Sequence, residues 1–119
     1  MAATFIRRVQ EKPLSLFSDG TYCYMGTNKG NIIRVTISGG ARAVIALVRR
    51  RAKITALAGD ATYLYAGDDR GRITRVKIAG DAANLILVNN IRSPVTSIFL
   101  STILYFGCAN GKVYSNAIT

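Results

Sequence analysis

Three related segments of twelve residues occur in this chain, about 40 residues apart. The copies read YMGTNKGNIIRV from Tyr24, YAGDDRGRITRV from Tyr65 and YFGCANGKVYSN from Tyr105. They share the frame Y-x-G-x-x-x-G-x-[IV]. A repeat of this length is typical of a supersecondary unit that cannot bury its own faces and stacks on copies of itself. The repeat therefore constrains the architecture of the protein much more than its activity.

Each repeat divides into four strands, a to d in chain order, when alternation of apolar and polar residues is combined with turn signals. The sequence predicts strands over residues 14–18, 21–26, 31–38 and 43–49, then over 54–58, 62–67, 72–79 and 84–90, and finally over 95–100, 103–108 and 112–118. Residues 41–52, ARAVIALVRRRA, would also make a fair helix by propensity. Their counterpart in the second repeat, AANLILVNNIRS, is β-like, so consistency between repeats favours a strand in both.

The third repeat lacks strand d, and the chain begins with a segment that could replace it. Residues 4–13, TFIRRVQEKP, align with residues 44–53 and 85–94, in which apolar residues are likewise followed by charged or amide residues. The sequence therefore predicts one domain over 1–119. Residues 4–13 are its closing strand d, and 14–53, 54–94 and 95–119 are its three units.

This arrangement resembles the β-propeller repeats of WD-repeat-like and quinoprotein-like proteins, whose blades often carry the same frame across strands b and c. The resemblance covers the whole chain, although there is no tryptophan and hence no Trp-Asp pair. It implies an all-β fold with three four-stranded blades. Since propellers have four to eight blades, we expect a six-bladed propeller formed by a homodimer, with the N-terminal strands exchanged. Pairing with a different propeller half, or origin as a fragment of a longer propeller, are the alternatives.

The chain is strongly basic, with sixteen Lys and Arg, six Asp and Glu, and a net charge of +10. Such a balance favours acidic partners, nucleic acid above all. In a propeller the d-a and b-c connections share one face, which would carry nine basic and three acidic residues, while the opposite face would carry Asp19, Asp60, Asp81 and Arg42. The predicted polyanion contacts on the basic face are Lys29, Arg50, Arg51, Lys53, Arg70, Arg72 and Lys112.

Catalytic constellations are scarce, because the chain has no histidine and so no Ser-His-Asp, Cys-His or His-based metal site. Asp68 and Asp69 are adjacent in one turn beside Arg70, which is typical of a solvated, charge-balanced loop rather than a cation site. Asp19 and Asp60 are expected to hold their turns. We expect no enzymatic activity, catalytic residue, metal or cofactor.

The predicted function is a non-enzymatic binding or scaffold module whose basic face suits nucleic acid or acidic protein segments. The alternative is an assembly subunit that binds a protein partner, with the charge serving only solubility.

Other residue types are assigned to the scaffold. The tyrosine pairs of the first two repeats are expected to pack between repeats rather than stack on bases, and the two cysteines, which stand in different registers, to remain reduced thiols. No apolar run approaches the ~18 residues that cross a bilayer, and the N-terminus lacks the features of a signal peptide, so a cytoplasmic protein without a membrane partner is expected. The basic residues expected to lie on strands and cover the rim are Arg7, Arg8, Arg34, Arg49, Arg75 and Lys77.

Overall fold

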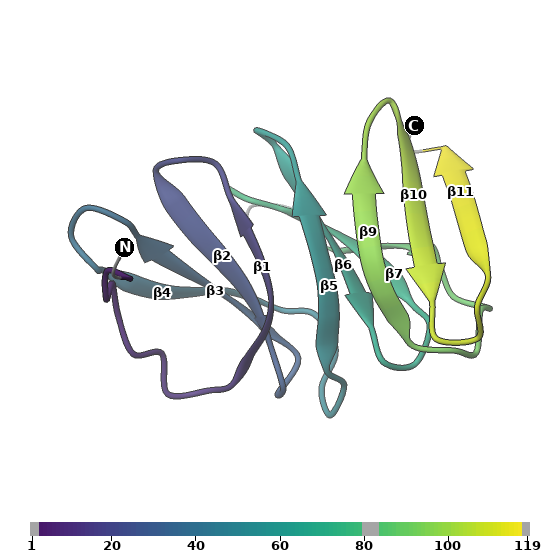
Figure 1. The fold of residues 1–119 in the computed structure, drawn as a ribbon, viewed down its shortest axis with the longest axis horizontal. Coiled ribbons are helices and arrows are strands. Elements are labelled where there is room, and N and C mark those ends of the chain that lie inside the picture. Colours follow the sequence, from purple (N-terminus) through teal and green to yellow (C-terminus); the bar gives the residue numbers. More distant parts are fainter. Residues whose placement is uncertain (1–2, 80–83, 118–119) are drawn as a thin grey trace.

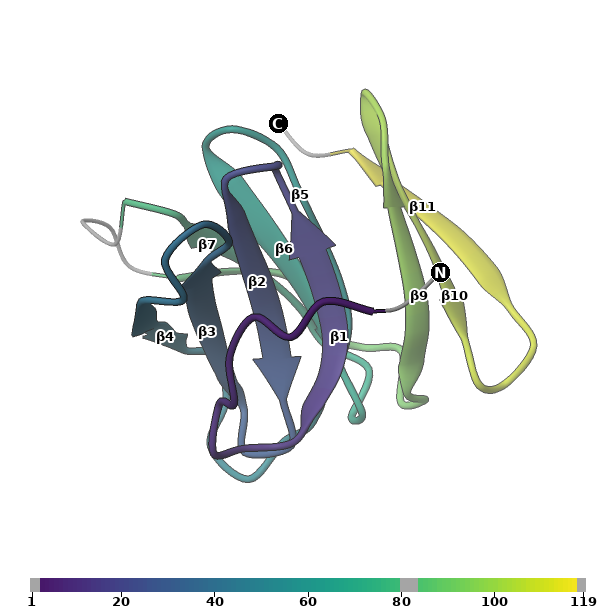
Figure 2. The same ribbon diagram turned by 60° about the vertical axis from the view of Figure 1, so that its left-hand side comes forward.

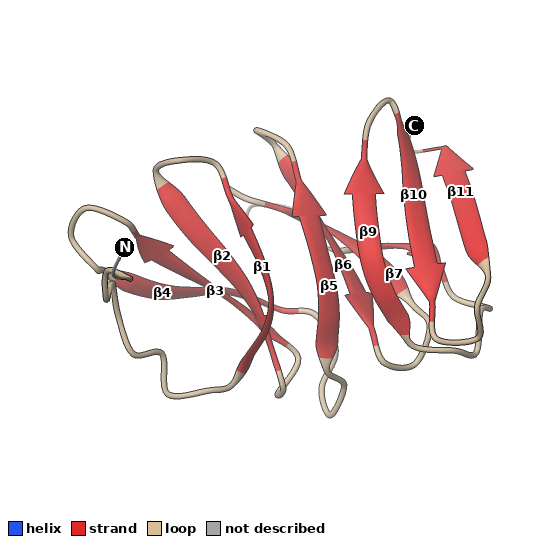
Figure 3. Ribbon diagram, in the orientation of Figure 1, coloured by secondary structure: helices blue, strands red, loops and turns tan. Residues whose placement is uncertain are grey.

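The computed structural model of the chain describes residues 3–79 and 84–117. All regular structure in these ranges is β-strand, arranged as three antiparallel sheets (Figures 1 and 3). Sheet 1 has the strand order β1-β2-β3-β4, sheet 2 the order β5-β6-β7-β8, and sheet 3 the order β11-β10-β9. The bounds are β1 Pro13–Ser18, β2 Tyr22–Thr27, β3 Asn31–Thr36, β4 Arg42–Leu47, β5 Ile54–Gly59, β6 Tyr63–Asp68, β7 Ile73–Lys77, β8 Leu85–Val88, β9 Val95–Leu100, β10 Ile103–Cys108 and β11 Val113–Ala117.

The prediction of an all-β fold is confirmed, and each observed strand agrees with a predicted one to within two residues at either end. The segment that could have been a helix is β4. It is held as a strand because β3 pairs with it, Ile33 opposite Val44 and Asn31 opposite Leu47. Sheet 3 ends at β11 and has no fourth strand within the described residues, as the sequence predicts.

The sheets stack face to face, with the first strand of each nearest to the next sheet (Figure 1). One buried cluster lies between sheets 1 and 2 and includes Tyr24, Ile32 and Leu57. A second lies between sheets 2 and 3 and includes Tyr65 and Phe106. Each sheet therefore buries one face against its neighbour, which is how a repeat that has no core of its own becomes stable.

The stacking is close because a glycine of β2 or β6 faces a branched side chain of the next sheet. A Cβ atom placed on Gly26 would lie 2.2 Å from Cγ2 of Ile54, and one on Gly67 would lie 2.6 Å from Cγ1 of Val95. The shared frame of the repeat thus encodes sheet packing: its first glycine is the site into which the next sheet fits.

The N-terminal segment differs from the prediction. Residues 3–12 form no strand in the single chain, in contrast to the strand expected over 4–13. They cross the face of sheet 1 that is turned away from sheet 2, where Val9 is buried against Met25, Ile33 and Val35 (Figure 2). The physical reason is that a strand needs a neighbouring edge, and the free edge of sheet 3 lies at the opposite end of the stack (Figure 1).

The chain enters β1, β5 and β9 through the same local geometry, which we call the entry link. Three residues before each strand stands a non-glycine residue in the left-handed region, namely Gln10 (φ 66°), Arg51 (φ 62°) and Arg92 (φ 60°). The residue just before each strand accepts a main-chain hydrogen bond from the turn between the second and third strands. The three bonds run from Asn28 to Lys12, from Asp69 to Lys53 and from Ala109 to Pro94, at 3.0, 3.0 and 2.9 Å. The N-terminal segment is therefore joined to sheet 1 as β4 and β8 are joined to sheets 2 and 3.

Candidate functional site

Two kinds of loop lie together at one end of the stack, the lower edge in Figure 1, and we call this end the loop surface. It consists of the β2–β3, β6–β7 and β10–β11 turns, the β4–β5 and β8–β9 connections, and residues 10–12. Besides the bonds of the entry links, Val48 N–H donates to the Gly30 carbonyl at 2.8 Å. As the sequence predicts, these loops share one end, and hydrogen bonds join each turn to at least one of the neighbouring connections or to residues 10–12.

Asp68 holds the β6–β7 turn from inside. One carboxylate oxygen accepts the backbone N–H groups of Arg70 and Arg72 at 2.9 and 3.1 Å, and the other lies 3.3 Å from a guanidinium nitrogen of Arg49. The Asp68 side chain is only 1% exposed. The solvated loop predicted at this position is wrong for Asp68, because the carboxylate replaces the backbone acceptors that the tight turn cannot supply. The placement of Arg49 on a rim strand is also wrong, since β4 ends at Leu47 and Arg49 lies in the β4–β5 connection.

In sheet 1 a hydroxyl group accepts the equivalent N–H groups of the β2–β3 turn. Thr27 stands where Asp68 stands in sheet 2, and its Oγ1 accepts the N–H groups of Lys29 and Asn31 at 3.2 and 3.3 Å. The same hydroxyl donates to the Glu11 carboxylate at 2.6 Å, and the Asn31 amide donates to Glu11 at 3.1 Å. The Thr27 hydrogen bond, aided by Asn31, lowers the pKa of Glu11, although partial burial opposes the shift.

The lowered pKa of Glu11 predicts a pH dependence. The pKa of Glu11 in the folded chain lies below its ordinary value of 4.5. The ionised carboxylate therefore stabilises the fold above pH 4.5, and this stabilisation is lost as the pH falls through the folded pKa. Glu11→Gln is expected to lower the free energy of unfolding by about 1 kcal/mol at pH 7. Urea unfolding between pH 7 and 3 measures this, and the gap between wild type and variant should narrow toward acid. A gap that stays constant or widens on acidification would contradict the assignment.

The seven predicted contact residues all lie on the loop surface. Six are exposed, and Arg72 is half-buried, with its Nε buried and without a hydrogen-bond partner among the described residues. The Arg70 guanidinium donates to the Arg51 carbonyl at 3.1 Å, which brings the β6–β7 turn against the β4–β5 connection. Five of the seven therefore gather where sheets 1 and 2 meet: Arg50, Arg51, Lys53, Arg70 and Arg72. Lys29 lies in the adjoining β2–β3 turn, and Lys112 stands apart in sheet 3.

The acids of the loop surface do not pair with these cations. The third acid, Asp69, accepts the backbone N–H of Lys53 at 3.0 Å. Within residues 3–79 and 84–117, the ion pair with a nitrogen–oxygen distance of 4.0 Å or less is Arg49–Asp68, and Arg49 is not one of the seven. The negative charges thus hold the loops, and the six exposed predicted contact residues form no ion pair within 4.0 Å among the described residues.

The opposite end of the stack behaves as the sequence predicts. Asp19 accepts the N–H groups of Thr21 and Tyr22, and Asp60 those of Thr62 and Tyr63, all at 2.8–2.9 Å. The Tyr22 N–H bond is the main cause of a lowered pKa for Asp19. These two carboxylates therefore close turns between the first and second strands. Asp81 lies outside the described residues.

The tyrosines and two of the strand arginines belong to the scaffold. Tyr24 and Tyr65 are buried between sheets, and burial raises the pKa of both phenols. The guanidinium carbon of Arg34 lies 4.6 Å from the ring centre of Tyr22, and that of Arg75 lies 4.2 Å from the ring centre of Tyr63. These repeat-equivalent cation–π contacts cover one ring face of Tyr22 and one of Tyr63, so those faces are not open for a base to stack on.

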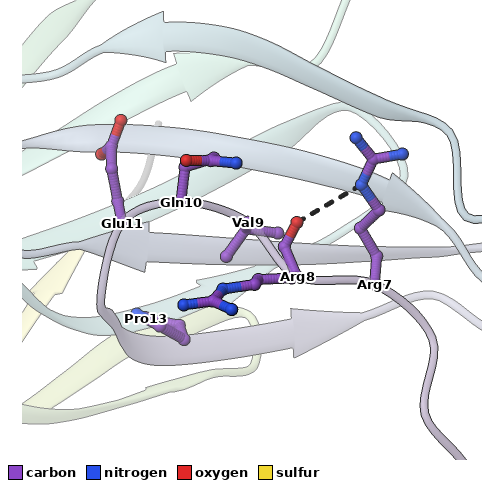
Figure 4. A pocket seen from close by; sticks show the side chains of 6 residues that line it. All are labelled: Arg7, Arg8, Val9, Gln10, Glu11 and Pro13. Carbon is purple, nitrogen blue, oxygen red and sulfur yellow. Dashed lines mark hydrogen bonds between the residues drawn. The ribbon is translucent and has the colours of Figure 1, made fainter.

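The described residues show little else that could perform chemistry. They contain no cluster of three or more His, Cys, Asp or Glu side chains able to hold a metal ion. Cys23 and Cys108 are free thiols, and burial raises the pKa of Cys108. A hollow of about 480 Å³ lies inside the arch of residues 7–13 (Figure 4), but one short segment supplies all its lining, including Arg7, Arg8 and Glu11. No helix within the described part of the chain could span a membrane.

Known proteins resemble this chain in their fold. The chain is similar in structure to the computationally designed protein Ika4, with a TM-score of 0.51 and 15% sequence identity over 99% of this chain and 100% of that chain. A second designed protein, Ika8, matches with a TM-score of 0.45 and 15% identity, over 92% of this chain and 48% of that chain. No family model and no curated protein sequence matches.

Proposed function

We propose that this chain is a non-enzymatic β-propeller module whose loop surface binds nucleic acid. One observation carries the proposal: the acids of the loop surface are engaged with turn N–H groups, the Thr27 hydroxyl and Arg49, while six of the seven predicted contact residues are exposed and form no ion pair within 4.0 Å among the described residues. Exposed cations that form no ion pair attract a polyanion, because each phosphate they neutralise releases condensed counterions.

The propeller is proposed to be a six-bladed ring of two chains. The entry links support this, because Gln10 joins the N-terminal segment to β1 in the way that Arg51 and Arg92 join β4 and β8 to the sheets that follow them. A segment that enters sheet 1 in this manner belongs to the preceding sheet, and sheet 3 is the one with an unfilled edge. Exchange of residues 4–13 between two copies would complete both third blades and remove two free sheet edges.

Ring formation would also concentrate the charge. With Arg49 included, the loop surface carries ten basic and three acidic residues per chain, which gives seven net positive charges per chain and fourteen per dimer. In a two-fold ring both loop surfaces face the same way around the central axis. A nucleic acid strand lying across that face would therefore meet cations of both copies.

The test is a pair of variants with equal net charge. Arg50→Gln with Arg51→Gln removes two positive charges from the loop surface, and Thr21→Glu with Thr62→Glu adds two negative charges at the opposite end, where both side chains are exposed. Fluorescence anisotropy with labelled single-stranded RNA and duplex DNA, at several salt concentrations, measures binding. The first variant should bind at least ~10-fold more weakly, and its slope of log K against log salt should fall by ~0.9 for each duplex phosphate that is no longer neutralised.

The variant with the two glutamates should bind nearly as well as the wild type, because its charges are far from the ligand and screened beyond about 10 Å at 0.1 M salt. Equal weakening in both variants would show that binding follows net charge alone. Absence of binding by the wild type to either nucleic acid, with binding to an acidic peptide instead, would replace nucleic acid by a protein ligand. Absence of all three would overturn the proposal.

A further inference from the structure

The stack of sheets ends in two apolar faces that no other sheet covers. One is the face of sheet 3 turned away from sheet 2, and we call it the open face. The other is the face of sheet 1 turned away from sheet 2, and we call it the outer face. We propose that the open face of one copy docks on the outer face of a second copy, a contact that rests on the two-chain ring proposed above and identifies its surfaces.

The open face repeats residues that are buried in the other two sheets. Tyr105 stands where Tyr24 and Tyr65 stand; those two are each 1% exposed, whereas Tyr105 is 41% exposed. Val113 stands where Ile32 and Ile73 stand; those two are fully buried, whereas Val113 is 78% exposed. The same strand positions thus carry the side chains of a sheet-to-sheet contact that the single chain does not make.

The surroundings of Gly107 indicate which kind of residue fits against the open face. The equivalent glycines receive Ile54 and Val95 so closely that a Cβ atom would collide with them, whereas a Cβ atom on Gly107 would meet only Ser97 Oγ at 3.1 Å and Thr96 Oγ1 at 4.0 Å. A shallow hollow of about 210 Å³ lies at this place, with Phe99, Tyr105 and Val113 in its lining. The site built for the first strand of a following sheet is present and unfilled within the described residues.

The outer face carries the residues that would pack against the open face. Ile54 and Val95 are the first paired residues of β5 and β9, and the residue in the same register of β1 is Pro13. Three positions further along β1 stands Leu16, which is 60% exposed, whereas its counterpart in β5, Leu57, is buried against sheet 1. Leu16, Met25, Ile33 and Val44 are paired across all four strands of sheet 1 and form an apolar row on this face.

Composition favours a second copy over another occupant. The paired residues of the open face, Ser97, Phe99, Ile103, Tyr105, Val113 and Ser115, include no charged side chain. The apolar row of the outer face has none either. The open face and this apolar row, whose residues occupy positions equivalent to those in buried contacts of the same chain, are complementary to each other, and a two-fold axis would form the contact twice.

The N-terminal segment occupies part of the docking site in the single chain. Phe5 and Ile6 line a pocket of about 300 Å³ together with Leu16, Cys23, Met25 and Val35 of the outer face. Docking of a second copy therefore requires residues near Phe5 and Ile6 to leave this face. The entry link at Gln10 can stay in place, and the released residues then lie where they can pair with β11 of the second copy. The segment acts as a cover that the correct partner displaces.

The experiment measures mass in solution by light scattering at several protein concentrations. The wild type should have twice the chain mass of 12.8 kDa. Val113→Asp and Leu16→Lys each place a charge at a position that is exposed in the single chain, so each variant should remain folded by circular dichroism but have the mass of one chain. Ile86→Asp is the matched control, because Ile86 is 46% exposed on sheet 2, which has both neighbouring sheets within the chain. It should keep the dimer mass.

Mixing the two interface variants gives the decisive result. A mixed dimer of Val113→Asp and Leu16→Lys has one wild-type contact and one contact in which Asp faces Lys, so the mixture should regain the dimer mass that neither variant has alone. A wild type of single-chain mass at all concentrations, variants that remain dimers, or a mixture that stays monomeric would each overturn the docking surface. Nucleic-acid binding is read separately through Arg50 and Arg51, so failure of one proposal leaves the other measurable.

Discussion

Substitution of Gly30 by alanine is expected to lower the free energy of unfolding by about 4 kcal/mol, from left-handed strain and steric conflict together. Gly30 has a φ of 83°, which a residue with a side chain adopts at a cost of about 1–2 kcal/mol. In addition, a Cβ atom there would lie 1.9 Å from the carbonyl oxygen of Arg49. That oxygen is backbone and belongs to the hydrogen-bonded β4–β5 connection, so it cannot rotate away as the end of a flexible side chain could.

The chain provides an internal control at the same turn position. Gly111 has a φ of 85° but no neighbour within 4 Å of an added Cβ atom, so Gly111→Ala should cost only the ~1–2 kcal/mol of backbone strain. Gly71, with φ 84° and a nearest neighbour at 2.8 Å, should fall between the two. Urea unfolding of the three variants at a concentration where the chain is monomeric measures the order. Equal destabilisation at Gly30 and Gly111 would refute the close approach.

Removal of the Asp68 carboxylate should have the next largest effect. Asp68→Ala would leave the N–H groups of Arg70 and Arg72 without their acceptor and Arg49 without its ion-pair partner. We expect the free energy of unfolding to fall by about 3 kcal/mol, the cost of leaving a buried charge pair and two turn donors unsatisfied, reduced because Arg49 and Arg70 reach solvent. Thermal and urea unfolding measure it.

Sheet 1 suggests the rescue variant. Thr27 satisfies the equivalent N–H groups with a hydroxyl, so Asp68→Thr should keep the turn and remove only the ion pair with Arg49, at a cost of about 1 kcal/mol. Arg49→Gln should cost more than Asp68→Thr, because it leaves the buried Asp68 carboxylate without its ion-pair partner. If threonine proved as damaging as alanine, the carboxylate would have a role other than holding this turn.

Most of the strand arrangement could be predicted from the sequence, because the signals involved are local. Alternation of apolar residues and the positions of turn glycines decide where a strand begins and ends, and the repeat supplies three copies of each signal. The decision between helix and strand at 41–52 illustrates this. Propensity favoured a helix, but pairing with β3 outweighs a few tenths of a kcal/mol per residue, and the β-like sequence of the second repeat indicated that pairing.

The roles of individual charged residues could not be predicted in the same way. Asp68 and Asp69 are adjacent and identical in type, yet their carboxylates have different partners. The Asp68 side chain is 1% exposed and accepts N–H groups of its own turn, whereas Asp69 accepts the N–H of Lys53 in the β4–β5 connection. The difference arises from which side of the turn each carboxylate faces, and the sequence pattern indicates only proximity. One signal was available: Thr27, Asp68 and Cys108 occupy the same position after the repeated Y-x-G, and small or short polar residues there indicate an inward side chain.

The N-terminal segment shows a different limit. Its alignment with the fourth strands is supported by the entry link, but a strand is a property of two segments, and the sequence of one chain does not say which neighbour is present. In the single chain Val9 of this segment is buried on the nearest exposed apolar face, the outer face of sheet 1, and Phe5 and Ile6 lie beside it. In the two-chain ring proposed above, the same residues would lie on sheet 1 in the single chain and form a strand when a second copy is bound.

The uniform entry links also bear on how a protein of this kind can change in length. β1, β5 and β9 begin at Pro13, Ile54 and Val95, 41 residues apart each time, and the peptide before each strand has the same conformation and the same hydrogen bond. A deletion of residues 13–53, or a duplication of them, would rejoin the chain at a junction equal to those already present. In the proposed ring, the number of chains needed for closure would then be set by how many units are encoded in tandem, and the contacts between chains would need no type of residue that the contacts within a chain do not already have.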